Sequence, residues 1–86
     1  MSKVITPTVH WNGSSKTTLA IGYQEAVNTL RAAMSAHEKT APNARDYYVQ
    51  GDGVYQRACA QHMARAQALH DVLVELSTIR EAIADQ

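Results

Sequence analysis

The chain has 86 residues, and its eight Lys and Arg balance eight Asp and Glu. This length allows one domain at most, and a lone monomer of this size is expected to be marginally stable unless it is crosslinked or oligomeric. The neutral charge, with no basic block, argues against a protein that binds duplex nucleic acid.

Several sequence features concern the compartment. Residues 1–7 contain no apolar run of the length of a signal peptide, and no stretch approaches the roughly 20 apolar residues of a transmembrane helix. The single cysteine, Cys59, cannot form a disulfide within the chain, and we expect a small buried side chain in a reducing environment. The chain is therefore predicted to be a soluble cytoplasmic protein without a membrane partner.

Residues 1–15 are predicted to form an extended arm that closes in a turn. Val4 and Ile5 favour extended structure, and Pro7 interrupts them. The pair Asn12-Gly13 favours a turn, because both residues tolerate positive φ. The arm is too short for a sheet of its own, so we expect it to lie against helices or to pair with the arm of another copy.

A first helix is predicted over residues 16–40, where small or apolar residues recur every three or four positions. Ser14 or Ser15 can serve as its N-cap, and Pro42 ends it. Gly22 costs about 1 kcal/mol relative to Ala inside a helix, and we expect its small size to admit a neighbouring backbone.

A second helix is predicted over residues 53–84, after a loop at 41–52 and with Asp52 as its N-cap. At 1.5 Å per residue the two helices measure about 37 and 45 Å, longer than a compact chain of this size is wide. The predicted fold is therefore all-α, a long antiparallel helical hairpin in a single domain.

The apolar residues of both helices spread over more of each helix surface than one helix-helix contact needs. Such residues are Val27, Met34, Val72, Leu73 and Ile79. We expect a second hairpin to cover them, which gives a homo-oligomeric helix bundle with at least two copies.

The loop concentrates the polar chemistry of the chain. Arg45 offers planar donors for a carboxylate or phosphate, and Tyr47 and Tyr48 offer aromatic faces with hydroxyl groups. Together with Asn43, which could read a polar edge, they suit a flat anionic ligand such as a nucleotide. A purely structural alternative remains, in which Arg45 pairs with Asp46 or a helix end and one tyrosine plugs the open end of the hairpin.

His10 and Trp11 form a second candidate binding surface. The indole could stack on a base or anchor the arm in a groove between helices. Beside the loop of the same or a neighbouring copy, these two residues and Asn12 would line a pocket with Arg45 and Tyr47.

Other polar residues of the helices favour structural roles. His37 and His62 fall on apolar stripes and are expected to be hydrogen-bonded core histidines. Cys59 and His62 form half of a metal site, but the chain has no second cysteine, so no metal is predicted. Arg57, Gln61 and Arg65 share one helix face, which is either solvated or reads phosphate.

No catalytic motif is present, neither a nucleophile with a base nor a glycine-rich phosphate loop, so we expect no enzyme and no cofactor. Two segments carry a likeness instead, Val9-His10-Trp11-Asn12-Gly13 and Pro42-Asn43-Ala44-Arg45-Asp46-Tyr47-Tyr48. With them the chain resembles short phage-encoded helical proteins with a His-x-Asn-Gly arm and a Pro-Asn-x-Arg-Asp-Tyr-Tyr loop. By analogy of size and architecture, this resemblance implies an oligomeric counter-defence factor that sequesters a nucleotide immune signal. The alternatives are a module that docks on and inhibits a host protein, and a virion assembly accessory.

Overall fold

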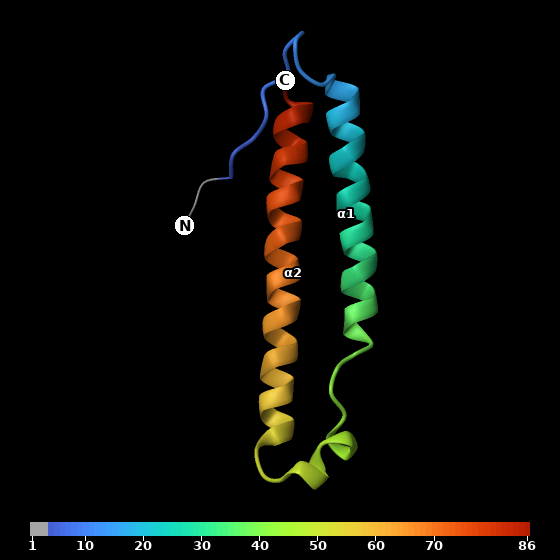
Figure 1. Ribbon diagram of the computed structural model, residues 1–86, viewed down its shortest axis with the longest axis vertical. Helices are drawn as coiled ribbons and strands as arrows, with labels where there is room; N and C mark the ends of the chain where they lie inside the picture. Colours follow the sequence, from blue (N-terminus) through green and yellow to red (C-terminus); the bar gives the residue numbers. More distant parts are fainter. Residues whose placement is uncertain (1–3) are drawn as a thin grey trace.

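The computed structural model describes residues 4–86, which form two long antiparallel helices side by side (Figure 1). Helix α1 spans Lys16–Glu38 and helix α2 spans Val54–Ala84. Two short 3-10 turns join them, η1 at Ala44–Asp46 and η2 at Tyr48–Gln50. The described part of the chain contains no strand, so the all-helical prediction is confirmed. Neither helix is both long and apolar enough to cross a membrane.

Helix α1 starts where the sequence places a cap. The Ser15 hydroxyl oxygen accepts the backbone N–H of Thr18 at 3.0 Å, which satisfies a first-turn donor that would otherwise lack a partner. At the other end, the Thr40 hydroxyl donates to the carbonyl of His37 at 2.7 Å. The helix therefore stops at Glu38, two residues before the predicted end at residue 40.

The predicted N-cap of α2 is wrong. Gly53, with φ of 79°, occupies the cap position, and no side chain caps the helix. Gly51 also has positive φ, at 106°. The chain turns into α2 through backbone angles that side chains other than glycine rarely adopt, so Asp52 lies one residue too early to cap.

The molecule is a thin rod with almost no interior. Its extents are 61 × 26 × 17 Å and its radius of gyration is 18.4 Å, whereas a globular chain of this length would have a radius of about 12 Å. Only Val27 and Ile83 are fully buried among the described side chains. Two helices touching along one line cannot cover more than one stripe of each other.

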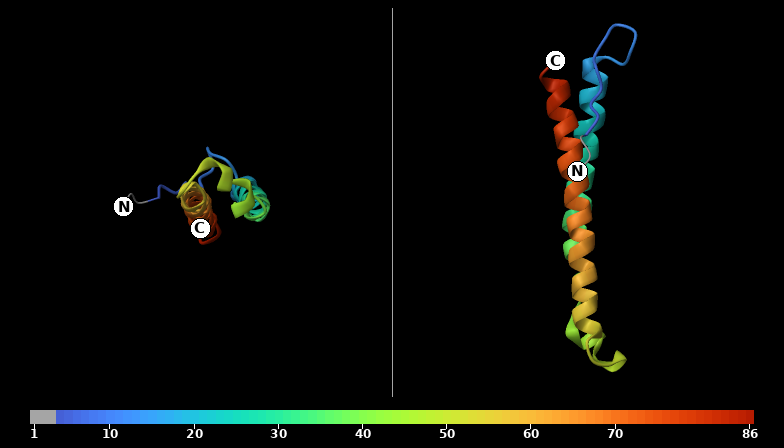
Figure 2. Two further views of the ribbon diagram at one scale, coloured as in Figure 1. Left: turned by 90° about the horizontal axis from the view of Figure 1, so that it is seen from below. Right: turned by 90° about the vertical axis from the view of Figure 1, so that its left-hand side faces the viewer.

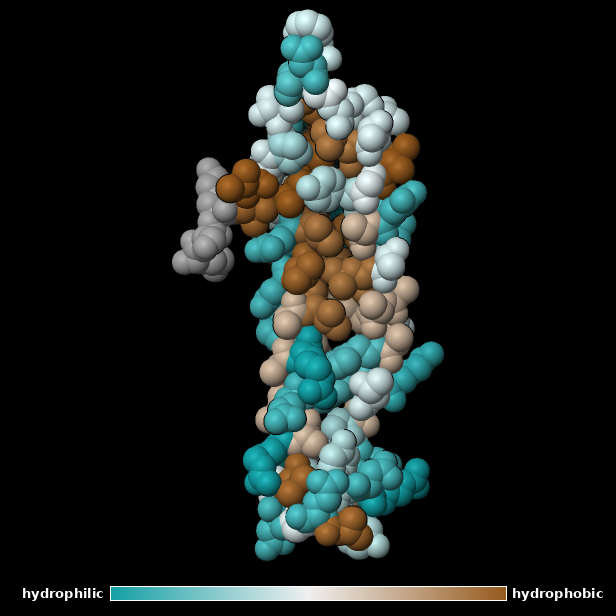
Figure 3. Space-filling model, in the orientation of Figure 1, coloured by the Kyte–Doolittle hydropathy of each residue, from teal (hydrophilic) through white to brown (hydrophobic). Residues whose placement is uncertain are grey.

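The segment from residue 4 to 15 lies beside the C-terminal end of α2 (Figure 1). The Gln86 side chain holds it there, because Gln86 Oε1 accepts the N–H of Val9 at 2.7 Å and Gln86 Nε2 donates to the carbonyl of Pro7 at 2.8 Å. Figure 2 shows that the turn within this segment, at residues 10–13, and the loop between the helices both project to the same side of the rod. The face between these projections is the one seen in Figure 3, and we name it the front face.

The front face carries an apolar band between the helices, in the half of the rod that is remote from the loop (Figure 3). Helical geometry places Val72 and Ile79 of α2 on this side of the contact with α1, since each residue turns the helix by about 100°. Val72 is 45 % exposed. The half of the rod nearer the loop is mostly polar on this face.

Candidate functional site

The loop is held in shape by its own residues. The Asn43 Oδ1 atom accepts the backbone N–H of Arg45 at 3.1 Å and so caps η1. The predicted role of Asn43 as a reader of a ligand's polar edge therefore competes with a structural bond that its oxygen already makes. The Asn43 amide nitrogen takes part in no hydrogen bond within residues 4–86.

Arg45 and Tyr48 are both exposed on the loop. Within the described chain the Arg45 guanidinium makes no hydrogen bond and no ion pair, so it does not pair with Asp46 as the structural alternative supposed. Tyr48 is 75 % exposed. Tyr47 instead packs at the start of α2, where its ring centre lies 6.4 Å from that of Tyr55. One tyrosine thus plugs the end of the hairpin, and the other is free to contact a ligand.

The turn at residues 10–13, which contains His10 and Trp11, lies at the opposite end of the rod from the loop (Figure 1). The structure therefore does not bring these residues and the loop residues together within one chain 61 Å long. Trp11 is 92 % exposed, so it does not anchor the arm in a groove of its own chain. The predicted shared pocket could arise only between copies.

The turn at residues 10–13 forms as predicted but for a different reason. The N–H of Gly13 donates to the carbonyl of His10 at 3.0 Å, and neither Asn12 nor Gly13 has positive φ. A Cβ at position 13 would lie 2.9 Å from the His10 imidazole. A side chain at position 13 would therefore require the exposed His10 imidazole to move aside.

His37 and His62 meet between the two helices, where their rings stack with centres 4.2 Å apart and planes 9° from parallel. His37 Nε2 and His62 Nδ1 are buried without a hydrogen-bond partner, so the expectation of hydrogen-bonded core histidines is wrong at these atoms. If each imidazole is neutral and carries its proton on the other ring nitrogen, His37 Nδ1 or His62 Nε2, the buried nitrogens carry only a lone pair and leave no N–H donor without a partner. Burial, followed by the charges of His37 and Arg65, lowers the pKa of His62 below its usual value.

The stacked pair predicts a pH dependence of stability. Above pH about 6.5 His62 is neutral in both the folded and the unfolded chain, so its titration takes no stability from the fold in this range. As the pH falls below this value, the unfolded chain binds the proton first, and the folded state loses stability until the lower folded pKa is passed. We expect the melting temperature to drop between pH 7 and 5, as followed by circular dichroism.

A matched pair of variants isolates the effect. His62→Gln should flatten the pH dependence, whereas His70→Gln on the exposed side of α2 should keep it. An unchanged slope in His62→Gln would contradict the assignment.

The half-buried Cys59 of α2 is the residue that the sequence paired with His62 as half of a metal site. No cluster of three or more His, Cys, Asp or Glu suited to a metal ion occurs within residues 4–86. Cys59 lies close to Tyr55, and a side-chain hydrogen bond to Cys59 is the main cause that raises the pKa of this tyrosine.

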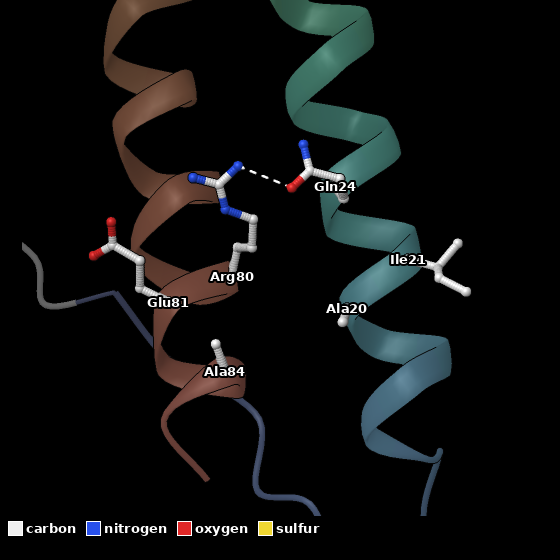
Figure 4. Close-up of a pocket in the computed structure, with 6 residues that line it drawn as sticks. All are labelled: Ala20, Ile21, Gln24, Arg80, Glu81 and Ala84. Atoms are coloured by element: carbon white, nitrogen blue, oxygen red, sulfur yellow. Dashed lines mark hydrogen bonds between the residues drawn. The ribbon is translucent and has the colours of Figure 1, made fainter.

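A groove of about 410 Å³ lies at the end of the rod that is remote from the loop (Figure 4). Arg80 reaches across it from α2 and donates from Nη1 to Gln24 Oε1 of α1 at 3.1 Å. In Figure 4 the C-terminal end of α2 points down, whereas in Figure 1 it points up, and α2 is on the left in both. Figure 4 therefore views the rod from the side opposite to Figure 1, and the groove opens on the face opposite the front face. Its lining is mostly apolar, and it is shallow and open to solvent.

Sequence reasoning missed both the histidine stack and the Gln24–Arg80 bond. The positions do carry a signal, because His62, Leu69, Leu76 and Ile83 repeat every seven residues along α2. The spacing shows that these residues face one partner helix, but only the register of the two helices decides which residue meets which.

No protein-family model matches the chain, and neither a curated protein nor a solved structure is similar to it.

Proposed function

We propose that the chain is a non-catalytic binding protein that works as a homo-oligomeric helix bundle of at least two copies. The observation that supports this proposal is the surface that one copy leaves exposed, 6530 Å². A folded monomer of this mass exposes about 5,000 Å². Each copy therefore has an excess of about 1,500 Å² to bury.

Two copies that hide this excess bury about 3,000 Å² together, which is the size of an obligate homodimer interface. The exposed apolar side chains supply the driving force, since residues 4–86 contain only two fully buried apolar side chains. A neutral net charge removes the long-range repulsion between copies.

Sedimentation velocity tests the proposal. We expect a single species of twice the chain mass or more at micromolar concentration, with a melting temperature that rises with protein concentration. A folded monomer that persists at 100 µM would contradict it.

The loop favours a second candidate function, the binding of a small phosphate-bearing ligand such as a nucleotide signal. The supporting observation is the combination of an unpaired, exposed Arg45 with the exposed Tyr48 ring on a loop that Asn43 holds in place. Arginine in this setting forms bidentate bonds to phosphate, and the tyrosine can stack on a base. Sequestration of a nucleotide immune signal would use this chemistry.

Calorimetry with a panel of nucleotides tests this second candidate. We expect binding that falls at least tenfold in Arg45→Ala and is unchanged in Arg31→Ala, an exposed arginine of α1. Full binding by Arg45→Ala would exclude the loop as the site. A stoichiometric host protein captured without any nucleotide binding would favour the competing role as a docking inhibitor.

A further inference from the structure

The front face combines two stripes of different side-chain size. On α1 the stripe is small, and consists of Gly22, Ala26, Thr29 and Ala33. On α2 it is large and apolar, and consists of the exposed Val72 and the half-buried Leu76 and Ile79. Both stripes follow steps of three and four residues, so each lies along one side of its helix.

The two stripes overlap in height along the rod. Gln24 bonds to Arg80 and His37 stacks on His62, so residues of the two antiparallel helices that lie level have numbers that sum to between 99 and 104. Ala26 is then level with residues 73–78 of α2, and Ala33 with residues 66–71. A small side chain on one helix thus stands beside a large one on the other.

No residue of the described range 4–86 lies against Gly22 of the small stripe. A Cβ built on Gly22 would meet no atom within 4 Å, and Ala33 is exposed. The predicted close approach of a backbone at Gly22 is therefore not made by this chain. In α2 the neighbouring Val72 is 45 % exposed.

We infer that the front face docks a second copy of the chain, front to front, with the loops of both copies at the same end. This inference rests on the proposed homo-oligomer and specifies its interface. A two-fold axis along the rod sets α1 of one copy opposite α2 of its partner at equal height. The large stripe of each α2 then packs into the small stripe of the partner's α1.

The opposite orientation fits the surface less well. A two-fold axis across the rod sets α2 against α2 and α1 against α1, so large side chains meet large ones and small ones leave a gap. If the two rods overlap over their full length in this orientation, the apolar band of each copy faces the mostly polar half of its partner's front face, the half nearer the loop. That half of α2 carries Arg57, Gln61 and Arg65 on the same side as Val72.

The projecting ends agree with the same arrangement. The loop and the turn at residues 10–13 both reach forward from the front face (Figure 2). When both loops lie at one end of the dimer, the loop of one copy lies beside the loop of the other, and the two turns at residues 10–13 lie beside each other at the other end. The loop and the turn of each copy then extend past the two ends of the partner's helices. The two Arg45 side chains then share one end of the dimer, and Trp11 of both copies lies at the other.

Distances between spin labels test the orientation directly. The label is placed at Gln50→Cys in a Cys59→Ala background, and distances are measured by pulsed electron paramagnetic resonance. We expect a loop-to-loop distance well below half of the 61 Å rod length. A distance near or beyond 61 Å would overturn the inference but keep the dimer, whereas absence of any coupling between labels would contradict the proposed oligomer itself.

A size-increasing variant tests the face. In Gly22→Leu the new Cβ meets no atom outside its own helical turn within 4 Å, and leucine improves the helix propensity. A role of Gly22 only in the folding of one copy therefore predicts a protein that is at least as stable. Docking on the front face predicts a dissociation constant at least tenfold higher. The control Ala32→Leu, also on α1 but turned away from α2, should not change it. Equal affinity in both variants would overturn the inference.

Discussion

Val72→Glu is expected to separate the copies, with a dissociation constant at least about a hundredfold higher than that of the unmodified chain, or about 2.7 kcal/mol. The physical reason is the burial of an ionised carboxylate in an apolar contact, where it finds no cationic partner. Val72 is 45 % exposed in one copy, so the isolated hairpin tolerates the charge. Sedimentation across a concentration series measures the change.

Val74→Glu is the matched control for this variant. It introduces the same charge at a valine of similar exposure, 50 %, two residues along the same helix. Two residues turn an α helix by about 200°, so Val74 lies on the side of α2 away from the front face. Dissociation by Val74→Glu and not by Val72→Glu would move the interface to the groove side of the rod.

Ile83→Ala is expected to cost about 2–5 kcal/mol of unfolding free energy, the usual range for a buried isoleucine cut to alanine. Ile83 has no exposed surface and is, with Val27, one of two fully buried side chains in the described part of the chain. It lies one turn before Gln86, whose side chain holds the N-terminal segment at Val9 and Pro7. The loss is large because small domains have only about 5–15 kcal/mol in total.

Chemical denaturation at a fixed protein concentration measures this loss. The control is Ile21→Ala, which removes the same atoms from an isoleucine that is 53 % exposed and replaces it by a better helix former. Its stability should change by less than about 0.5 kcal/mol. Similar losses in both variants would show that the few buried side chains do not carry the stability of the rod.

The helices could be predicted because their signals are local. Steps of three and four between apolar residues, the Ser15 cap and the break at Pro42 each act within one or two turns of the chain. The cap of α2 could not be predicted in the same way. The choice of Gly53 over Asp52 depends on the path of the whole loop, which needs two glycines with positive φ.

The sequence predicted a set of candidate binding residues, but it did not predict their geometry. Arg45, Tyr48 and Trp11 are exposed, as ligand-binding side chains must be. Their placement at opposite ends of the rod follows from helix length, which separates the two connecting segments instead of bringing them together.

By itself, the sequence determined that this protein is a pair of long helices with too little apolar volume for a core of its own. Periodicity and length are enough for that conclusion, because both act through the geometry of one helix at a time. Only the tertiary structure decided that His37 stacks on His62 and that small residues of α1 stand level with large ones of α2. Such pairings depend on the register between helices, which side chains far apart in the chain set together.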